Sequence, residues 1–242
     1  MKRLLIILCA LLFISIDSYA AAPLLHVSSD NPRYFADSSN NIVYLRGLNT
    51  NDGYEFQDHA FGGTELSDFN ITLNMYSANN LNFIRMWVSE GFGTPPNSPS
   101  PQPYLRSNVC CAEDGGNKFD LSLLNVGNLV TPSINSDNYF ERLRARAIAA
   151  RDNNIYLSVM LWHAFGWENG NQRLVGNNAW SHHPFKSSNN VQGINCDANA
   201  NGWGDDLGLL NNPCQSYQEA YIRQVIDSVN DFATQQIIFI ND

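Results

Sequence analysis

Arg85 is the charged residue whose place in the sequence most directly suggests chemistry. It lies in the apolar run Phe83 to Val88, and strand alternation puts it on the same face as Trp87. A guanidinium in a protein interior is costly unless a carboxylate pairs with it. We therefore expect Arg85 to face an acidic group, either in a reactive site near a strand end or in a purely structural ion pair.

Flat aromatic side chains indicate a carbohydrate ligand. The five tryptophans all fall at predicted strand ends or in the loops beyond them: Trp87, Trp162, Trp167, Trp180 and Trp203. An indole ring has an apolar face and a polar edge, which suits the C–H face of a sugar. We prefer Trp87 and Trp167 as sugar platforms and keep Trp162 and Trp180 as further candidates. Packing in the core or within a loop is the alternative role.

The remaining candidates are possible metal ligands. His182 and His183 suit sugar contact or loop packing better than zinc, because no H-E-x-x-H spacing accompanies them. A calcium loop has more support, since four residues fit its positions one, three, five and nine: Asp197, Asn199, Asn201 and Asp205. The twelfth position holds Gly208 where a glutamate is expected, so a loop without an ion is the alternative. We expect no other cofactor.

The first twenty residues have the pattern of a secretory signal peptide. Lys2 and Arg3 precede the apolar run Leu4 to Ile16, and small residues precede a cleavage site after Ala20. Residues 1–20 are therefore predicted to be removed, residues 21–242 to form one domain, and the protein to be secreted or periplasmic. The run is too short for a membrane anchor, which takes about 20 apolar residues. We expect no membrane contact after processing.

Four cysteines remain after this removal, and in an oxidising compartment they are expected to form disulfides. The preferred pair is Cys196 with Cys214, which leaves Cys110 and Cys111 as a neighbouring pair or as free thiols. Two long bridges between the region near residue 110 and the region near residue 200 are the alternative.

The charge balance excludes some partners. The chain has 14 basic and 23 acidic residues, a formal net charge of -9. Phosphate groups are bound by clustered lysines and arginines, so nucleic acid and anionic lipid are not expected partners.

Alternating strands and helices must position the candidate residues. A small β-hairpin is predicted for His26 to Leu45, around the turn-forming segment 37–41. The later predicted strands are Leu45–Asn49, Phe83–Val88, Ile155–Leu161 and Ile237–Ile240. The predicted helices are Phe69–Asn79, Asn138–Asn153 and one that begins at a capping box of Ser216 and Glu219. A proline-rich stretch after the second strand and residues 164–214 are predicted to be long loops.

This order predicts an α/β fold with a parallel sheet and helices outside it. Long loops follow the strands and short ones follow the helices, as in a (β/α)8 TIM-type barrel, whose site is built from the loops at the strand C-termini. The chain is thus expected to be such a barrel truncated after about the fourth strand, with the small N-terminal β-hairpin in front. A doubly wound sheet gives the same alternation, but no G-x-G-x-x-G follows the first strand.

Three parts of the chain carry a family resemblance: Tyr34–Asp37 with Val43–Gly47, Leu81–Trp87, and Tyr221–Phe232. Together they resemble cellulase-like retaining glycoside hydrolases of the large (β/α)8-barrel clan, over about residues 26–242 and as the N-terminal half only. The resemblance implies that Arg85 and His163 support the catalytic carboxylates. It also puts Asn241 and Asp242 where the clan has an Asn-Glu pair whose glutamate is the acid/base. Asp is one methylene shorter, and Ala233–Ile238 departs from the clan's usual pattern.

The resemblance implies incomplete machinery in these residues. Retaining hydrolysis uses two carboxyl groups about 5–5.5 Å apart, and the clan's nucleophile belongs to a seventh strand that is not among them. We therefore expect a secreted glycoside hydrolase-like protein for polysaccharide or oligosaccharide, inactive as this chain alone. A non-catalytic carbohydrate-binding protein is the first alternative, and a disulfide-stabilised structural or adhesion protein is the second.

Overall fold

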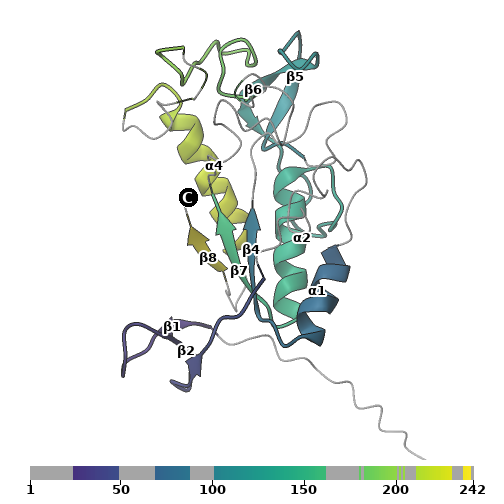
Figure 1. Cartoon of the computed structure of the whole chain (residues 1–242). Coiled ribbons are helices and arrows are strands. Elements are labelled where there is room, and N and C mark those ends of the chain that lie inside the picture. Colours follow the sequence, from purple (N-terminus) through teal and green to yellow (C-terminus); the bar gives the residue numbers. More distant parts are fainter. Residues whose placement is uncertain are drawn as a thin grey trace, which may run out of the picture.

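A three-stranded parallel sheet lies at the centre of the molecule (Figure 1). The computed structural model describes residues 24–48, 69–87, 101–161, 180, 183–200, 202, 204, 211–230 and 237–240. The sheet consists of β4 (Phe83–Trp87), β7 (Tyr156–Met160) and β8 (Ile237–Ile240), in the order β4-β7-β8. Every residue of β7 is buried, as expected for an apolar strand covered on both faces. The predicted parallel pairing of these three segments is confirmed.

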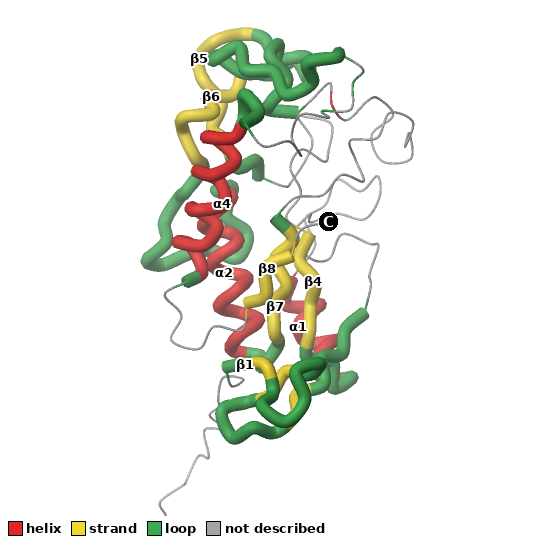
Figure 2. Tube along the Cα trace, turned by 90° about the vertical axis from the view of Figure 1, so that its left-hand side faces the viewer, coloured by secondary structure: helices red, strands yellow, loops and turns green. Residues whose placement is uncertain are grey.

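Three helices accompany the sheet: α1 (Phe69–Ala78), α2 (Tyr139–Asp152) and α4 (Gln215–Val229). Helices α2 and α4 lie beside each other on one side of the sheet (Figure 2), and α1 lies next to α2 (Figure 1). The apolar side of each helix faces the sheet, and Leu143 of α2 and Val225 of α4 are fully buried there. They belong to the same hydrophobic core as Ile84 and Val159 of the sheet. The helices predicted near 69–79 and 138–153 are confirmed to within a residue or two.

The N-terminal hairpin is a small antiparallel sheet of three two-residue strands: β1 (His26–Val27), β2 (Phe35–Ala36) and β3 (Ile42–Val43). Asp37 closes its turn, because one carboxylate oxygen accepts the backbone N–H groups of Ser39 and Asn41, both at 2.9 Å. The hairpin lies at the end of the central sheet where the parallel strands begin (Figure 1). Burial, and after it the nearby Asp37, raises the pKa of Tyr156 at the start of β7. The predicted hairpin is confirmed.

A second hairpin lies beyond the opposite edge, where the parallel strands end (Figure 1). Its strands are β5 (Tyr104–Cys110) and β6 (Asn117–Leu124), paired antiparallel. The loop 183–200 is joined to it, because Phe119 N–H donates to Asn189 O at 2.7 Å and Val191 N–H donates to Phe119 O at 2.9 Å. The long irregular loop that the prolines predict here is wrong for the part that follows Pro103, where β5 begins at Tyr104.

Two smaller predictions are also corrected. Residues 45–48 form no strand; the carbonyl of Arg46 instead accepts the backbone N–H groups of Asn82 and Phe83, at 2.9 and 3.0 Å. Helix α4 begins at Gln215 with Cys214 as its N-cap, so Ser216 lies inside the helix and forms no capping box. In the part of the chain that is described, no helix is long and apolar enough to cross a membrane. Closure into a (β/α)8 barrel stays a prediction.

Candidate functional site at the carboxyl edge of the sheet

Arg85 lies on the face of the parallel sheet that points away from α2 and α4. In β4 it alternates with Ile84 and Met86, whose side chains belong to the helix-covered core. Its partner position on β7 is Ser158, on the same face. The guanidinium Nη2 lies 3.9 Å from the sulfur of Met160, two residues further along that strand. This part of the site thus combines a cation with a thioether and a hydroxyl.

Ser158 adds a polar group to this face. Its residue is 1% exposed, and its hydroxyl oxygen has no hydrogen-bond partner within the described residues. A buried hydroxyl without a partner is costly, and such groups often mark places where another polar group or a water is bound. The half-buried Arg85 and the buried Ser158 therefore give the sheet a pair of polar side chains on the face opposite α2 and α4.

The carboxyl ends of the strands lie two residues beyond Arg85 on β4 and Ser158 on β7. Trp87 of β4 is paired with Met160 of β7, and Met160 with Ile240 of β8. The hydroxyl of Tyr221 on α4 donates to the carbonyl of Leu161 at 3.2 Å, which fixes the point where the chain leaves β7.

Most of the residues predicted for this edge lie outside the described residues. They are Trp162, His163, Trp167, His182, Asn241 and Asp242, together with the side chain of Trp87. Of the predicted catalytic set, Arg85 is therefore the member whose surroundings the structure describes.

Trp180 and His183 form a buried stack. Their rings are 4.9 Å apart and nearly parallel, and the two residues are 1% and 2% exposed. Gly204, with φ +64, completes the packing, because a Cβ there would come within 2.7 Å of the indole. The face that a sugar would need on Trp180 is occupied by protein, so the geometry of these two residues is that of loop packing, the alternative role considered for each.

His183 is held in its neutral form. Burial lowers the pKa of its imidazole to about 3. Its Nδ1 accepts the backbone N–H of Phe185 at 3.0 Å, so the ring carries its proton on Nε2. A neutral imidazole with this acceptor role organises the start of the loop 183–200 rather than exchanging protons with a ligand.

Asn190 organises the same loop, and sequence reasoning missed it. Its side-chain amide donates to three backbone carbonyls: Pro184 at 2.9 Å, Lys186 at 2.9 Å and Ile194 at 2.8 Å. Its carbonyl oxygen accepts the N–H of Ile194 at 2.9 Å. The neighbouring Asn189 donates to His183 O at 2.9 Å. One of many asparagines in a polar segment carries no sequence signal of burial.

The preferred disulfide, Cys196 with Cys214, is present, and Cys110 and Cys111, for which a neighbouring pair or free thiols had both been left open, are bonded to each other. The first connects the loop that contains Asp197 to the start of α4. Asp197 is 4% exposed and accepts the N–H of Gly202 at 2.9 Å through Oδ2. Asn199 is described, whereas Asn201 and Asp205 lie outside the described residues. Within the described part, no three His, Cys, Asp or Glu side chains converge as a metal site.

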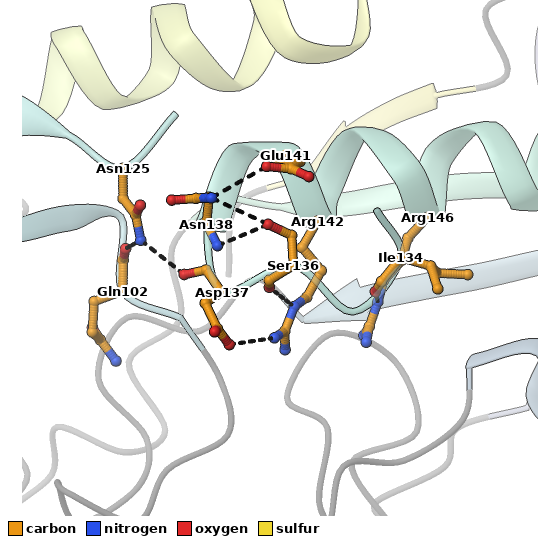
Figure 3. A network of polar contacts seen from close by, with 9 residues as sticks. All are labelled: Gln102, Asn125, Ile134, Ser136, Asp137, Asn138, Glu141, Arg142 and Arg146. Carbon is orange, nitrogen blue, oxygen red and sulfur yellow. Dashed lines mark hydrogen bonds and ion pairs between the residues drawn. The ribbon is translucent and has the colours of Figure 1, made fainter. Parts of the chain in front are cut away.

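Glu141, near the N-terminus of α2, is a structural acid. Its carboxylate accepts the backbone N–H groups of Asn128 at 2.8 Å and Ser133 at 3.0 Å. It also accepts the side-chain amide of Asn138 at 3.2 Å (Figure 3). Burial alone would raise the pKa of Glu141, but these hydrogen bonds together bring it below its usual value. A carboxylate so fully occupied by donors shapes the loop before α2.

Two buried arginines follow on the same helix. Arg142 and Arg146 are 1% and 0% exposed and lie one helical turn apart. The Nε of Arg142 donates to Ser136 O at 2.6 Å, and that of Arg146 to Ile134 O at 3.3 Å (Figure 3). Burial, and after it the charge of Arg146, lowers the pKa of Arg142 to about 9. Periodicity does not predict this buried pair, because both residues also fit a solvated helix face.

A scan against protein-family models, a search of curated proteins and a search of solved structures each found no match to this chain.

Proposed function

We propose that this chain forms part of a secreted glycoside hydrolase-like domain that acts on polysaccharide or oligosaccharide. The observation that carries the proposal is the position of Arg85 on the face of a parallel sheet opposite α2 and α4, beside Ser158 and close to the edge where the strands end. In a (β/α)8 barrel this face is the interior, and active sites lie at that edge. The guanidinium of Arg85 and the hydroxyl of Ser158 are both hydrogen-bond donors that could hold a carboxylate there.

The proposed catalytic roles belong to residues in the strands and to residues that follow directly after them. Arg85 would keep a catalytic carboxylate oriented and ionised through its two-pronged guanidinium. His163 comes two residues after Leu161, and Asp242 comes two residues after Ile240. In this proposal Asp242 is at the acid/base position and gives a proton to the leaving glycosidic oxygen. A second carboxylate, from a later strand, would attack the anomeric carbon, and water would then release the sugar.

Aromatic residues would bind the sugar rings. Trp87 ends β4, and Trp167 belongs to the segment that follows β7. The β5–β6 hairpin lies beyond the carboxyl edge of the sheet (Figure 1) and would form part of the rim around a bound chain. Indole faces at such a rim supply apolar contact to sugar C–H groups.

Carbohydrate binding by the mature chain tests the proposal. Calorimetric titration with a panel of neutral oligosaccharides is expected to give saturable binding that Trp87→Ala weakens by about tenfold or more, a loss typical of a central aromatic contact. Tyr44→Ala is the matched control, because this exposed aromatic lies in the hairpin at the opposite end of the sheet. Absence of saturable binding by folded protein would defeat the proposal.

Turnover separates the enzyme from a binding protein. Reading the coding sequence beyond Asp242 would reveal whether further β/α units with a late glutamate at a strand end follow. A chain extended by them is expected to hydrolyse an aryl glycoside. Binding without any turnover by that extended chain would favour the non-catalytic alternative.

A further inference from the structure

We propose that the loop opened by Asp197 binds a calcium ion, with the Asp197 carboxylate as the anchoring ligand. The proposal concerns a structural ion and is independent of the proposed carbohydrate chemistry.

The first support is a buried carboxylate oxygen that lacks a partner. Asp197 is 4% exposed. Its Oδ2 accepts the Gly202 N–H, but Oδ1 has no hydrogen-bond partner within the described residues. Leaving a charged oxygen buried and unsatisfied costs more than leaving a neutral one. A cation bound at Oδ1 would remove that cost.

The second support is the way the loop folds back on this carboxylate. Asp197 and Gly202 stand at positions one and six of the sequence pattern, and position six requires a glycine for a sharp turn. Gly202 has φ +85, a backbone conformation that side chains disfavour. Its N–H reaches across the loop to Oδ2 at 2.9 Å, so the carboxylate points into the loop. The oxygen left over is the one that a metal would take.

The donor chemistry favours calcium over a transition metal. Asn199, which is among the described residues, stands at the third position of the pattern, two residues after Asp197. Carboxylate and amide oxygens are hard ligands, which suit calcium, whereas zinc prefers nitrogen and sulfur. Because Gly208 replaces the bidentate glutamate at position twelve, we expect weak binding, with a Kd of about 0.1–1 mM as in extracellular calcium modules.

A disulfide and a hydrogen bond hold the N-terminal end of the loop in place. Cys196 immediately precedes Asp197, is fully buried, and is bonded to Cys214, the N-cap of α4. The side-chain amide of Asn195 donates to Asp197 O at 2.8 Å. The first ligand is thus pre-positioned, and an ion at this place would fix the loop relative to α4.

Calcium titration of the chelator-treated mature chain tests the site. Calorimetry is expected to show saturable calcium binding, and calcium is expected to raise the thermal midpoint, while magnesium at the same concentration does neither. Asp197→Asn keeps the side-chain volume and an acceptor for Gly202 but removes the charge, so it should weaken binding at least tenfold. Asp152→Asn is the matched control, because this acid is exposed at the end of α2 and should bind calcium as the wild type does.

A gain-of-binding variant keeps the test decisive if Asp197→Asn does not fold. Asn199→Asp adds a carboxylate at the third position and should tighten calcium binding several-fold. No saturable binding up to about 10 mM calcium, well above the range of extracellular calcium modules, would overturn the proposal. So would an unchanged affinity in a folded Asp197→Asn protein, because the buried oxygen would then be satisfied by something other than the metal.

Discussion

Tyr139 of α2 and Tyr221 of α4 join the two helices through their hydroxyl groups, which lie 2.8 Å apart in the core. Tyr221 also donates to the carbonyl of Leu161 at 3.2 Å. With its own proton used there, the Tyr221 oxygen accepts from Tyr139, and a continuous chain of bonds links both helices to the end of β7. Leu161 is two residues before His163, so these tyrosines set where the proposed catalytic segment leaves the sheet.

Replacing Tyr221 should therefore cost more than replacing Tyr139. Tyr221→Phe removes both bonds and is expected to lower the free energy of unfolding by about 1–3 kcal/mol, whereas Tyr139→Phe removes one and should cost about 1 kcal/mol. Urea unfolding of the two variants and of the double variant measures the costs. The double variant should lose less than the sum, because the two hydroxyls share a bond. Strict additivity would show that they do not interact.

Glu141→Gln should destabilise the start of α2. One oxygen of the carboxylate becomes an NH2 group that faces the N–H donors of Asn128 or Ser133, so a charge-assisted bond is replaced by two opposed donors. We expect a loss of about 2 kcal/mol in the free energy of unfolding at neutral pH. Asp137→Asn, four residues earlier, is the control: this acid is fully exposed and its ion pair with Arg142 spans 3.9 Å, so its loss should cost little. Equal effects of the two substitutions would contradict the structural role of Glu141.

Helices and strands could be predicted from the sequence because the spacing of their apolar residues depends only on which side chains are buried. Phe140, Leu143 and Ala147 recur at helical spacing and are all buried in α2. The continuous apolar run of β7 is buried at every residue. Cys196 and Cys214 were expected to pair, since they flank a polar loop between predicted elements, and they do.

The missed features depend on contacts between distant segments. The β5–β6 hairpin has two register shifts, which break the alternation that a sequence pattern needs. Trp180 is buried because the ring of His183 stacks on its indole and the backbone at Gly204 closes against the same side chain. Neither the shifts nor this closure leaves a local pattern in the sequence.

Asn190→Asp should disrupt the loop 183–200 at constant side-chain size. The amide nitrogen of Asn190 donates to three carbonyls, and in the variant a carboxylate oxygen would face those same three acceptors. We expect a loss of about 3 kcal/mol, because a buried charge would meet no donor at that position. Limited proteolysis should cut the loop faster in the variant. Wild-type resistance would show that Asn190 does not hold the loop closed.

Opening the Cys196–Cys214 disulfide should release the same region. The bond closes a chain segment with a sequence separation of 18, for which loop closure contributes about 3 kcal/mol. The double variant Cys196→Ala/Cys214→Ala is therefore expected to unfold at lower urea concentration. Cys110→Ala/Cys111→Ala is the comparison, since a bond between neighbours closes no long loop and should contribute much less. A larger effect of the second pair would contradict this ranking.

His183 should make the protein acid-sensitive. Its pKa is about 3 in the folded chain against an ordinary 6.5, so the folded state holds the neutral ring while the unfolded chain takes up a proton. The stabilising contribution is complete above pH 6.5 and is lost as the pH falls toward 3. By pH 5 the loss is about 2 kcal/mol. His183→Gln removes the titration, so the fall in the thermal midpoint between pH 7 and 5 should be smaller in the variant. Parallel pH curves, or an NMR titration of His183 centred near 6.5, would refute the assignment.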